Sequence, residues 1–354
     1  MVFEIANDYN CEQVLYCSDT DSGLKAIIVI HDSTFGPAAG GTRLMDYPSE
    51  EAALKDALRL AQGMTRKCAM AQSGTGGAKA VILARPEEKT EEMLRAYGRF
   101  VERLNGAFIT GNDVNIFFED AQILAEETRY ILGASDRLGP SSPVTAHGVL
   151  HGMRACVREV FGQDDLRGLT VAIQGLGGVG YALAQEVHNG GGKLIVSDIN
   201  EEAVKNTVEE LGATIATGDE IYSAEADVFA PCALGGVLNP ETIALLKCKI
   251  VCGGANNQLQ SYVDGDTLFE RGILYAPDYV VNAGGAIYVR IERTQPDATP
   301  EDLIAGAEII ETTMSEIIAE SKRTNQPTHV VADRIADERV RKEKERQKSR
   351  NNPG

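Results

Sequence analysis

The chain contains no hydrophobic run approaching the roughly 20 residues that a membrane-spanning helix needs. Basic residues are also few, since 34 Lys and Arg face 52 Asp and Glu and leave a formal net charge of −18. An acidic surface repels nucleic acid and anionic membranes, so we expect neither as a partner. The first segment, MVFEIANDYNCEQ, has no basic region followed by an apolar core. No export signal is therefore expected, and the cytoplasm is the expected location.

Paired cysteines are absent as well. The seven cysteines are scattered singly, with no CxxC and an odd total: Cys11, Cys17, Cys68, Cys156, Cys232, Cys248 and Cys252. This pattern is typical of reduced thiols in a cytosol, not of a disulfide framework or a zinc site. We expect most of these thiols to be small core side chains. The five histidines are read as lacking an HxxxH or similar spacing, so we expect no bound metal.

Length and composition fit a folded protein of two domains. The 354 residues are 43% hydrophobic and 24% charged, as in ordinary globular proteins. A Gly/Pro/Ser cluster at Gly139–Pro143 marks the expected boundary. Before it, short β-branched runs predict strands at Leu24–His31 and Lys79–Leu83, and helical spacing predicts helices at Ser49–Met64 and Glu91–Leu104. The first domain is therefore expected to be mixed α/β.

Beyond the cluster, the chain alternates strands with helical or loop segments. A helix is expected at Thr145–Phe161, followed by the apolar runs VAIQG, KLIVSD, DVFAPC, KIVCGG and ILYAPD. That rhythm predicts a mostly parallel, doubly wound sheet, so the fold class is α/β. Ligands of such sheets bind beyond the carboxyl ends of the strands. Several of these runs end there in turn residues: Gly175, Asp198, Pro231, Gly253 and Pro277.

The segment VAIQGLGGVG carries the GxGxxG pattern of a dinucleotide site. Gly175 permits a tight turn off a strand, Gly177 lets the backbone approach a pyrophosphate, and Gly180 lets the next helix pack on the strand. That helix, Val179–Asn189, would point its N-terminal amides at the phosphates. Asp198 ends the following strand, where its carboxylate would accept the ribose hydroxyls. No arginine follows Asp198, which favours NAD over NADP.

Two lysines and an aspartate of the first domain are candidates for chemistry. Lys79 stands between a glycine-rich loop and an apolar strand. If it is buried, it loses proton affinity and becomes a general base, whereas a lysine at a strand end also reaches water. Lys67 follows the first predicted helix in QGMTRK, and Asp113 lies in ITGNDVNI, a position that suits a site or an ordinary turn. The residues alone leave these alternatives open.

Ordered motifs extend over most of the chain. They read GPAAGGTR, GMTRKCA, GTGGAKAVI, TGNDVN, SPVTAHGV, GLGGVG, FAPCALGG, GGANNQL and PDYVVNAGG. In this order they resemble the Glu/Leu/Phe/Val dehydrogenase family, and within it the bacterial leucine, phenylalanine and tryptophan dehydrogenases. The resemblance implies an NAD-dependent oxidative deamination of an L-amino acid to its 2-oxo acid and ammonia. It also implies a homo-oligomer, at least a dimer.

The resemblance implies roles for individual residues. Lys67 would bind the substrate α-carboxylate as a point charge, Lys79 would be the base that activates water, and Asp113 would move protons to and from the amine. Gly40 and Gly41 would let the backbone approach the substrate. Asn282 would lie near the substrate amine. The implied cofactor-binding residues are Thr145, Gly175, Leu176, Gly177, Gly178, Val179, Gly180, Asp198, Ala230, Cys232, Ala255, Asn256 and Asn282.

The same resemblance divides the chain. It implies a substrate-binding and oligomerisation domain at 1–140 and a Rossmann NAD-binding domain at 141–295. Helices at 296–336, including an amphipathic one at Glu301–Ser321, would pack back across the cleft. The charged composition of 337–354 predicts a disordered tail.

The substrate side chain is expected to be apolar. Glutamate-specific relatives carry a lysine where this chain has Ala39, so a glutamate carboxylate would be left unpaired. The resemblance places Ala39, Gly111, Ala286 and Val289 around the side chain, and their small size favours an aromatic substrate, phenylalanine or tryptophan. A branched-chain substrate is the alternative, and a non-catalytic NAD-binding scaffold is a distant one. Ala78 departs from the family, in which many members carry glycine before the catalytic lysine.

Overall fold

The computed structural model describes residues 2–133 and 136–351, which form two compact units. Unit 1 comprises 1–140 and 336–354, and unit 2 comprises 141–335. Within the described residues, no helix has both the length and the hydrophobicity that crossing a membrane requires.

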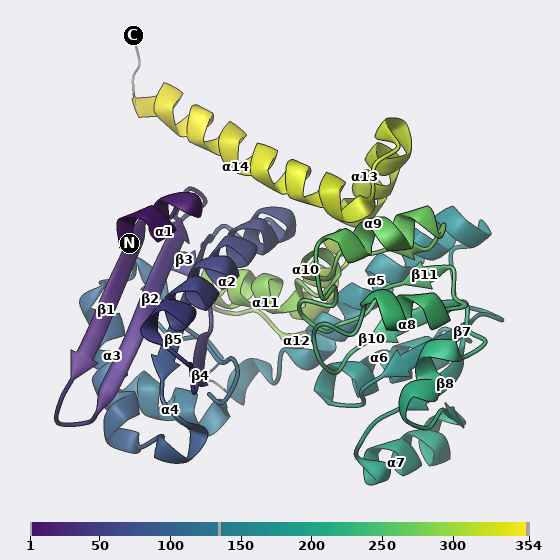
Figure 1. Ribbon diagram of the computed structural model, residues 1–354, viewed down its shortest axis with the longest axis horizontal. Helices are drawn as coiled ribbons and strands as arrows, with labels where there is room; N and C mark the ends of the chain where they lie inside the picture. Colours follow the sequence, from purple (N-terminus) through teal and green to yellow (C-terminus); the bar gives the residue numbers. More distant parts are fainter. Residues whose placement is uncertain (1, 134–135, 352–354) are drawn as a thin grey trace. The chain divides into compact units, whose positions relative to one another are not determined.

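Unit 1 contains one mixed sheet in the spatial order β1-β2-β5-β3-β6, with β4 also paired to β5 (Figure 1). Pairs β1/β2 and β2/β5 are antiparallel and the others are parallel. The strands and helices are β1 (Gln13–Asp19), β2 (Leu24–Asp32), β3 (Ala38–Ala39), β4 (Thr42–Met45), β5 (Gly76–Leu83), β6 (Phe108–Ile109), α1 (Val2–Asp8), α2 (Glu50–Ala71), α3 (Glu91–Arg103) and α4 (Phe118–Glu127). The predicted mixed α/β character of this region is confirmed.

The sheet of unit 1 is covered on both faces. Alternate residues of β2 point to opposite sides, so that Ile28 packs in the cluster with α3 and Val29 packs in the cluster with α2. Ser49 caps α2 as predicted, because its hydroxyl accepts the amide of Ala52 at 3.1 Å. The helix continues beyond its predicted end, since buried side chains recur through its last turns. Lys67 therefore lies inside α2 and not after it, which corrects the prediction.

Unit 2 contains a parallel sheet in the order β12-β11-β10-β7-β8-β9. Its strands are β7 (Thr170–Gln174), β8 (Lys193–Ser197), β9 (Thr214–Ile215), β10 (Val228–Pro231), β11 (Ile250–Val251) and β12 (Leu274–Tyr275). Its helices are α5 (Ser142–Phe161), α6 (Gly178–Asn189), α7 (Glu201–Leu211), α8 (Pro240–Leu245), α9 (Val263–Glu270), α10 (Asp278–Val281), α11 (Gly284–Thr294), α12 (Pro300–Ala307) and α13 (Ile309–Thr324). The predicted doubly wound α/β sheet is confirmed.

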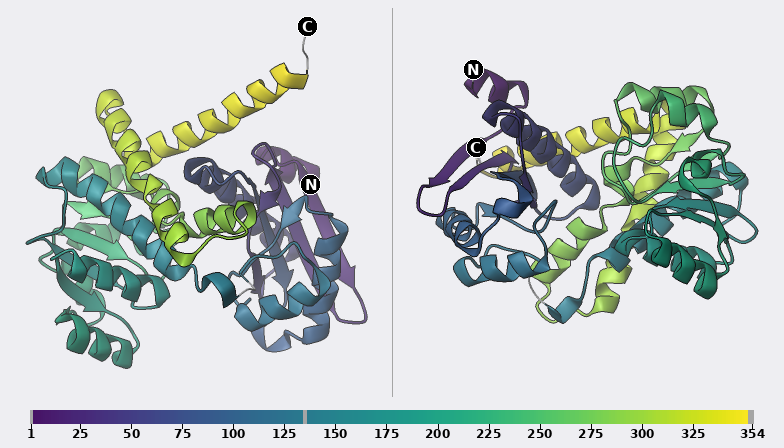
Figure 2. Two further views of the ribbon diagram at one scale, coloured as in Figure 1. Left: turned by 180° about the vertical axis from the view of Figure 1, so that it is seen from behind. Right: turned by 60° about the horizontal axis from the view of Figure 1, so that its bottom comes forward.

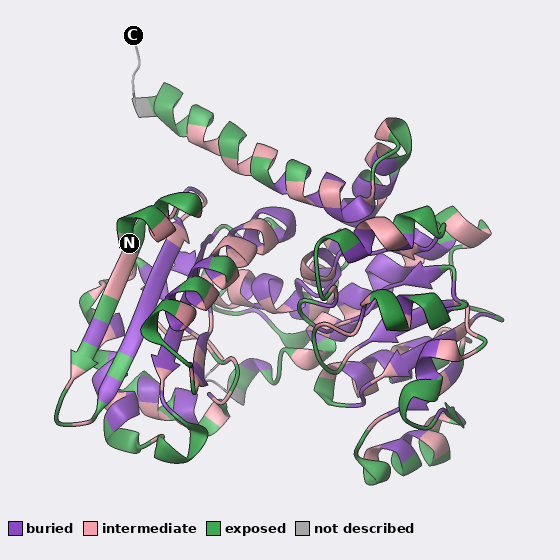
Figure 3. Cartoon of the chain, viewed as in Figure 1, coloured by how far each residue is buried: buried purple, intermediate pink, exposed green. Residues whose placement is uncertain are grey.

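Helices cover both faces of this second sheet (Figure 2). The aligned residues Ala172, Phe229 and Val251 share a core with side chains of α8 and α9. Helices α5 and α6 pack on one another and contact strands of the same sheet. Figure 3 shows the inner strands of this sheet largely buried and exposed residues on the helices around it, whereas the edge strand β9 is exposed. Strand order reverses between β7 and β10, which makes their carboxyl ends the expected ligand-binding edge.

The C-terminal helices differ from the prediction in two ways. The single helix expected at Glu301–Ser321 is two helices, because Glu308 makes tighter i to i+3 backbone bonds that interrupt the α-helical ladder. The expected disordered tail at 337–354 is helical as far as its description extends, since α14 spans Thr328–Asn351. Ion pairs one turn apart support α14. Residues 352–354 of that tail lie outside the described residues.

Candidate functional site

Lys79 is buried in the middle of β5, with its side chain 9% exposed. It shares a sheet face with Val81, which packs against α2. A Cβ added at Gly77, on the same face, would collide with Thr65 of α2. Lys67 belongs to that same helix and is half-buried. The two candidate lysines therefore come from elements that pack on one another, β5 and α2. The strand-end reading of Lys79 is wrong because β5 begins at Gly76.

The Lys79 ammonium contacts the Oδ2 of Asp113, so the structure brings the two predicted residues together. Burial lowers the pKa of Lys79 below its ordinary value, although the charge of Asp113 opposes the shift. Burial works to raise the pKa of Asp113, but the charges of Lys79 and Arg43 outweigh it and hold that pKa low. A buried amine of weakened proton affinity beside an ionised carboxylate is suited to proton transfer.

Arg43 is a member of this cluster that the sequence analysis missed. Its Nε lies 3.3 Å from Oδ2 of Asp113, and its guanidinium also reaches Oδ2 of Asp56 at 3.2 Å. Tyr47 donates to the same oxygen of Asp56 at 2.8 Å. Arg43 and Lys79 thus contact the same oxygen of the Asp113 carboxylate, and Arg43 also links this carboxylate to Asp56 of α2. The only available signal was a charged residue two positions after the double glycine Gly40–Gly41.

The glycines beside the cluster are required by the protein's own backbone. A Cβ at Gly40 would overlap the carbonyl oxygen of Ala78, and one at Gly41 would meet the carbonyl oxygen of Asn112. Ala78 does not have a positive φ, so alanine is accommodated there without strain. These close approaches bring the strand that carries Lys79 next to the loop that carries Asp113.

The four residues expected around the substrate side chain are divided between the units. Ala39 is buried in β3, and Gly111 is half-buried just after β6. Ala286 is buried and Val289 half-buried on α11 of unit 2.

The glycine-rich turn of unit 2 joins β7 to α6. Gly175 has φ +96°, which only glycine adopts readily, and a Cβ at Gly180 would overlap the carbonyl oxygen of Gly175. Gly177 caps α6, and a Cβ there would meet nothing within 4 Å. Two of the glycines are therefore needed for the turn itself, whereas the space at Gly177 is open at the amino end of a helix, where anions bind.

Asp198 closes this turn from the end of β8. Its Oδ2 accepts the amide of Leu176 at 2.5 Å, and its Oδ1 accepts the amide of Asn200 at 2.7 Å. Each carboxylate oxygen retains a lone pair for a further donor. The carboxylate thus lies at the glycine-rich loop with capacity to accept hydroxyl groups.

The remaining candidate residues of unit 2 gather at the same edge of the sheet. The amide of Cys232 bonds to Gln174 at 2.7 Å, so β10 ends beside the glycine-rich turn, and Ala230 is buried within β10. Asn282 donates to Oδ1 of Asn256 at 2.8 Å. The Oδ1 of Asn282 is buried and has no hydrogen-bond partner among the described residues.

Thr145 and Ala255 complete this group. A Cβ at Gly284 would collide with the backbone of Thr145, which places the start of α5 beside the start of α11. Ala255 is buried and its amide bonds to Pro231 at the end of β10. Gly178 and Val179 lie in the first turn of α6.

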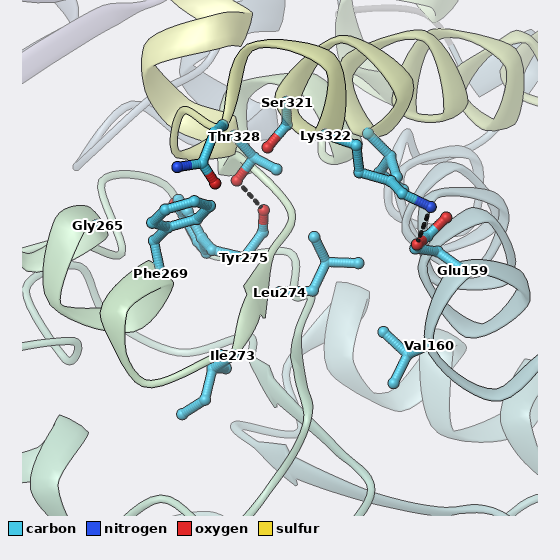
Figure 4. Close-up of a pocket in the computed structure, with 13 residues that line it drawn as sticks. Glu159, Val160, Gly265, Phe269, Ile273, Leu274, Tyr275, Ser321, Lys322 and Thr328 are labelled. Carbon is cyan, nitrogen blue, oxygen red and sulfur yellow. Dashed lines mark hydrogen bonds and ion pairs between the residues drawn. The ribbon is translucent and has the colours of Figure 1, made fainter.

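Unit 2 also contains a cavity of about 490 Å³ that none of the predicted site residues lines. It lies among α9, β12 and α13 (Figure 4). Lys322 pairs with Glu159 at 2.8 Å at its rim, and Thr328 donates to the carbonyl oxygen of Tyr275. These polar groups already have partners within the protein, so the cavity does not add to the site described above.

Comparison with known proteins gives the same family over most of the chain. Residues 11–137 match the Glu/Leu/Phe/Val dehydrogenase dimerisation domain, and residues 195–348 match the Glutamate/Leucine/Phenylalanine/Valine dehydrogenase domain. A leucine dehydrogenase from Bacillus cereus is 50% identical over 343 residues, covering 96% of this chain and 93% of that protein. An L-tryptophan dehydrogenase from Nostoc punctiforme is 45% identical over 345 residues, covering 97% of each.

Solved structures give a consistent result. The crystal structure of L-tryptophan dehydrogenase from Nostoc punctiforme matches with a TM-score of 0.86 at 44% identity, covering 97% of this chain and all of that one. The hetero-hexameric glutamate dehydrogenase from Thermus thermophilus matches with a TM-score of 0.76 at 22% identity, covering 96% of this chain and 94% of that one. The second match is a likeness of fold alone.

Proposed function

This chain belongs to the Glu/Leu/Phe/Val dehydrogenase family, and from that membership we propose that it oxidises an apolar L-amino acid with NAD. The broad activity is that of an amino-acid dehydrogenase of the leucine, tryptophan and phenylalanine type. The observation that carries the proposal is the buried contact between Lys79 and Asp113. A buried lysine of lowered pKa beside a carboxylate is typical of a catalytic site.

The residues of unit 1 account for the proton transfers. Lys67 binds the substrate α-carboxylate, and the substrate loses a hydride from its α-carbon to become an iminium. Lys79, as the neutral amine, takes a proton from the water that attacks this iminium. Asp113 takes a proton from the substrate ammonium before the hydride leaves, and it returns this proton to the nitrogen of the carbinolamine that water addition forms. The C–N bond then breaks, ammonia leaves with the electron pair, and the carbinolamine hydroxyl gives its proton to Asp113, so that the 2-oxo acid remains. Bound NAD supplies the hydride acceptor.

The residues of unit 2 fit a dinucleotide. Gly177 leaves open space at the amino end of α6, where a pyrophosphate binds. The unpartnered Oδ1 of Asn282 offers an acceptor for an amide or amine N–H group. Asp198 offers a carboxylate to the ribose hydroxyls and would repel the 2′-phosphate of NADP.

The preference for NAD is testable at Asp198. Replacing Asp198 with alanine is expected to weaken NAD binding by about 1.5–3 kcal/mol, the usual value of a hydrogen bond to a charged group. Asp198→Ala also removes the hydrogen bond from the Leu176 amide, and the resulting loss of order in the glycine-rich loop should weaken the binding of NAD and NADP alike. The informative quantity is therefore the ratio of the two Kd values, measured by fluorescence titration. A ratio equal to that of the unaltered protein would contradict the ribose contact.

Arg43 is expected to set the pH dependence of the reaction. Its positive charge lowers the pKa of Lys79, so Arg43→Met should raise that pKa. Deamination needs neutral Lys79, and the acidic limb of the kcat profile should therefore move to higher pH. Arg59→Met is the matched control, because Arg59 pairs with the other oxygen of Asp56 at 3.0 Å and, within the described residues, forms no ion pair with Asp113. Identical profiles for both variants would exclude this role for Arg43.

We propose an aromatic substrate, with a branched-chain substrate as the second candidate. Ala39, Gly111 and Ala286 offer small side chains around the expected position of the substrate. An aromatic ring in place of an isobutyl group would add about 1–2 kcal/mol of burial if that space is open. The 50% identity to the leucine dehydrogenase from Bacillus cereus supports the branched-chain substrate about as well as the small residues support the aromatic one.

One experiment tests the activity and the substrate together. Reduction of NAD and of NADP is measured with the purified protein and each of the twenty L-amino acids at mildly alkaline pH. Turnover of phenylalanine or tryptophan supports the aromatic proposal, and preference for leucine or valine supports the second candidate. Binding of NAD without turnover of any amino acid would overturn the enzymatic proposal in favour of a scaffold.

The two units are assigned complementary tasks in this proposal. Unit 1 binds the substrate and forms the contacts of a homo-oligomer, in line with its match to a dimerisation domain. Unit 2 binds NAD. The proposed location is the cytoplasm, which suits seven free cysteines.

A further inference from the structure

Two histidines of unit 2 form a cluster with a carboxylate that the proposed reaction does not use. His147 and His151 lie four residues apart on α5, so both project from one face of the helix. Their ring centroids are 4.6 Å apart. One potential ligand atom from each histidine and one from Glu308 lie within 4.8 Å of one another. Glu308 stands at the junction of α12 and α13. We infer that His147, His151 and Glu308 form a binding site for a divalent transition metal, with Zn²⁺ as the expected ion.

Each histidine is oriented by a carboxylate behind it. Nδ1 of His147 lies 2.9 Å from Oε1 of Glu186, and Nδ1 of His151 lies 2.7 Å from Oε2 of Glu311. An ionised carboxylate only accepts, so each ring donates its Nδ1–H and keeps the Nε2 lone pair for another partner. Histidines that bind metals are held by carboxylates in this way.

The Nε2 of His147 is the second observation that points to a ligand. It is buried and has no hydrogen-bond partner among the described residues, and the His147 side chain is 14% exposed. A buried acceptor without a partner is unfavourable, and a metal ion would satisfy it. Among the described residues, the Nε2 of His151 has only a contact with Arg154 at 3.5 Å, the outer limit of a hydrogen bond.

The donor set selects the class of metal. Two imidazole nitrogens and one carboxylate suit Zn²⁺, with water as a fourth ligand. Mg²⁺ and Ca²⁺ prefer oxygen ligands throughout. A bound ion would join α5 to the α12–α13 junction and thereby brace unit 2. This site differs from the expectation of no bound metal, which rests on reading the histidines as lacking an HxxxH spacing; His147 and His151 have that spacing in HGVLH.

Zinc binding to the full-length chain, stripped with chelator, tests the site by calorimetry. We expect one Zn²⁺ per chain at this site, with affinity at least about tenfold weaker in His147→Ala and in Glu308→Gln. His188→Ala is the matched control, since His188 is exposed on α6 and should leave binding unchanged. Zn²⁺ should raise the Tm of the unaltered protein and of the control, but not of His147→Ala.

Two results would overturn the site. One is the absence of zinc binding by the unaltered chain. The other is equal binding by the unaltered chain, His147→Ala and Glu308→Gln, which would assign the ion to other groups such as thiols. Glu308 is exposed, so Glu308→Gln tests the site even if His147→Ala fails to fold. Because the readouts are binding and Tm, the outcome is independent of the proposed dehydrogenase activity.

Discussion

Replacing Lys79 with alanine is expected to lower kcat for deamination by about 10²–10⁴, the usual contribution of a positioned general base. The variant should still fold and bind NAD, because Arg43 continues to pair with Asp113 at 3.3 Å. Steady-state kinetics and NAD titration on the same preparation measure both properties. Retention of substantial turnover would exclude Lys79 as the base.

Lys89→Ala is the matched control for this experiment. Lys89 also forms a largely buried ion pair in unit 1, with Asp120 at 2.6 Å, and takes no part in the proposed site. Its removal should lower stability by about 1–3 kcal/mol, because it leaves Asp120 without its charged partner, and should leave kcat unchanged. The comparison separates loss of a catalytic group from loss of a buried cation.

Gly180→Ala is expected to destabilise unit 2 by at least about 2 kcal/mol, as overpacking does. Helix propensity alone predicts the opposite sign, since alanine is more favourable than glycine within a helix by about 1 kcal/mol. The collision of the new Cβ with the carbonyl oxygen of Gly175 decides the outcome, because only movement of α6 relieves it. Denaturant unfolding of the variant measures the effect.

Gly177→Ala tests phosphate binding by the glycine-rich turn without disturbing the fold of the turn. A Cβ there meets no protein atom within 4 Å, and φ is −66°, so the fold should be unaffected. The methyl group would instead occupy the space proposed for the pyrophosphate, and NAD should bind at least about tenfold more weakly. If Gly177→Ala bound NAD normally, the proposed position of the phosphates would be wrong.

Local patterns in the sequence were sufficient for most of the architecture. Glycine spacing at Gly175 and Gly180 predicted the strand–turn–helix, because steric limits at those positions act over a few residues. The cap at Ser49 was also predictable, since its hydrogen bond spans a single turn. Less predictable were the ends of α2 and the break at Glu308, where tertiary packing overrides local preference.

The sequence by itself determined the fold class, the dinucleotide motif and, through its ordered motifs, the family, since all of these are encoded in the order and spacing of residues. Only the tertiary structure decided the state of Lys79, because its pKa depends on burial and on a carboxylate far away in the chain. The same holds for Arg43 and for the histidine cluster, whose partners Glu186 and Glu311 come from other helices. The periodicity of the sequence does not show which side chains of different elements lie close together. The strength of an electrostatic interaction depends on the distance between the charged groups, so it follows only from the tertiary structure.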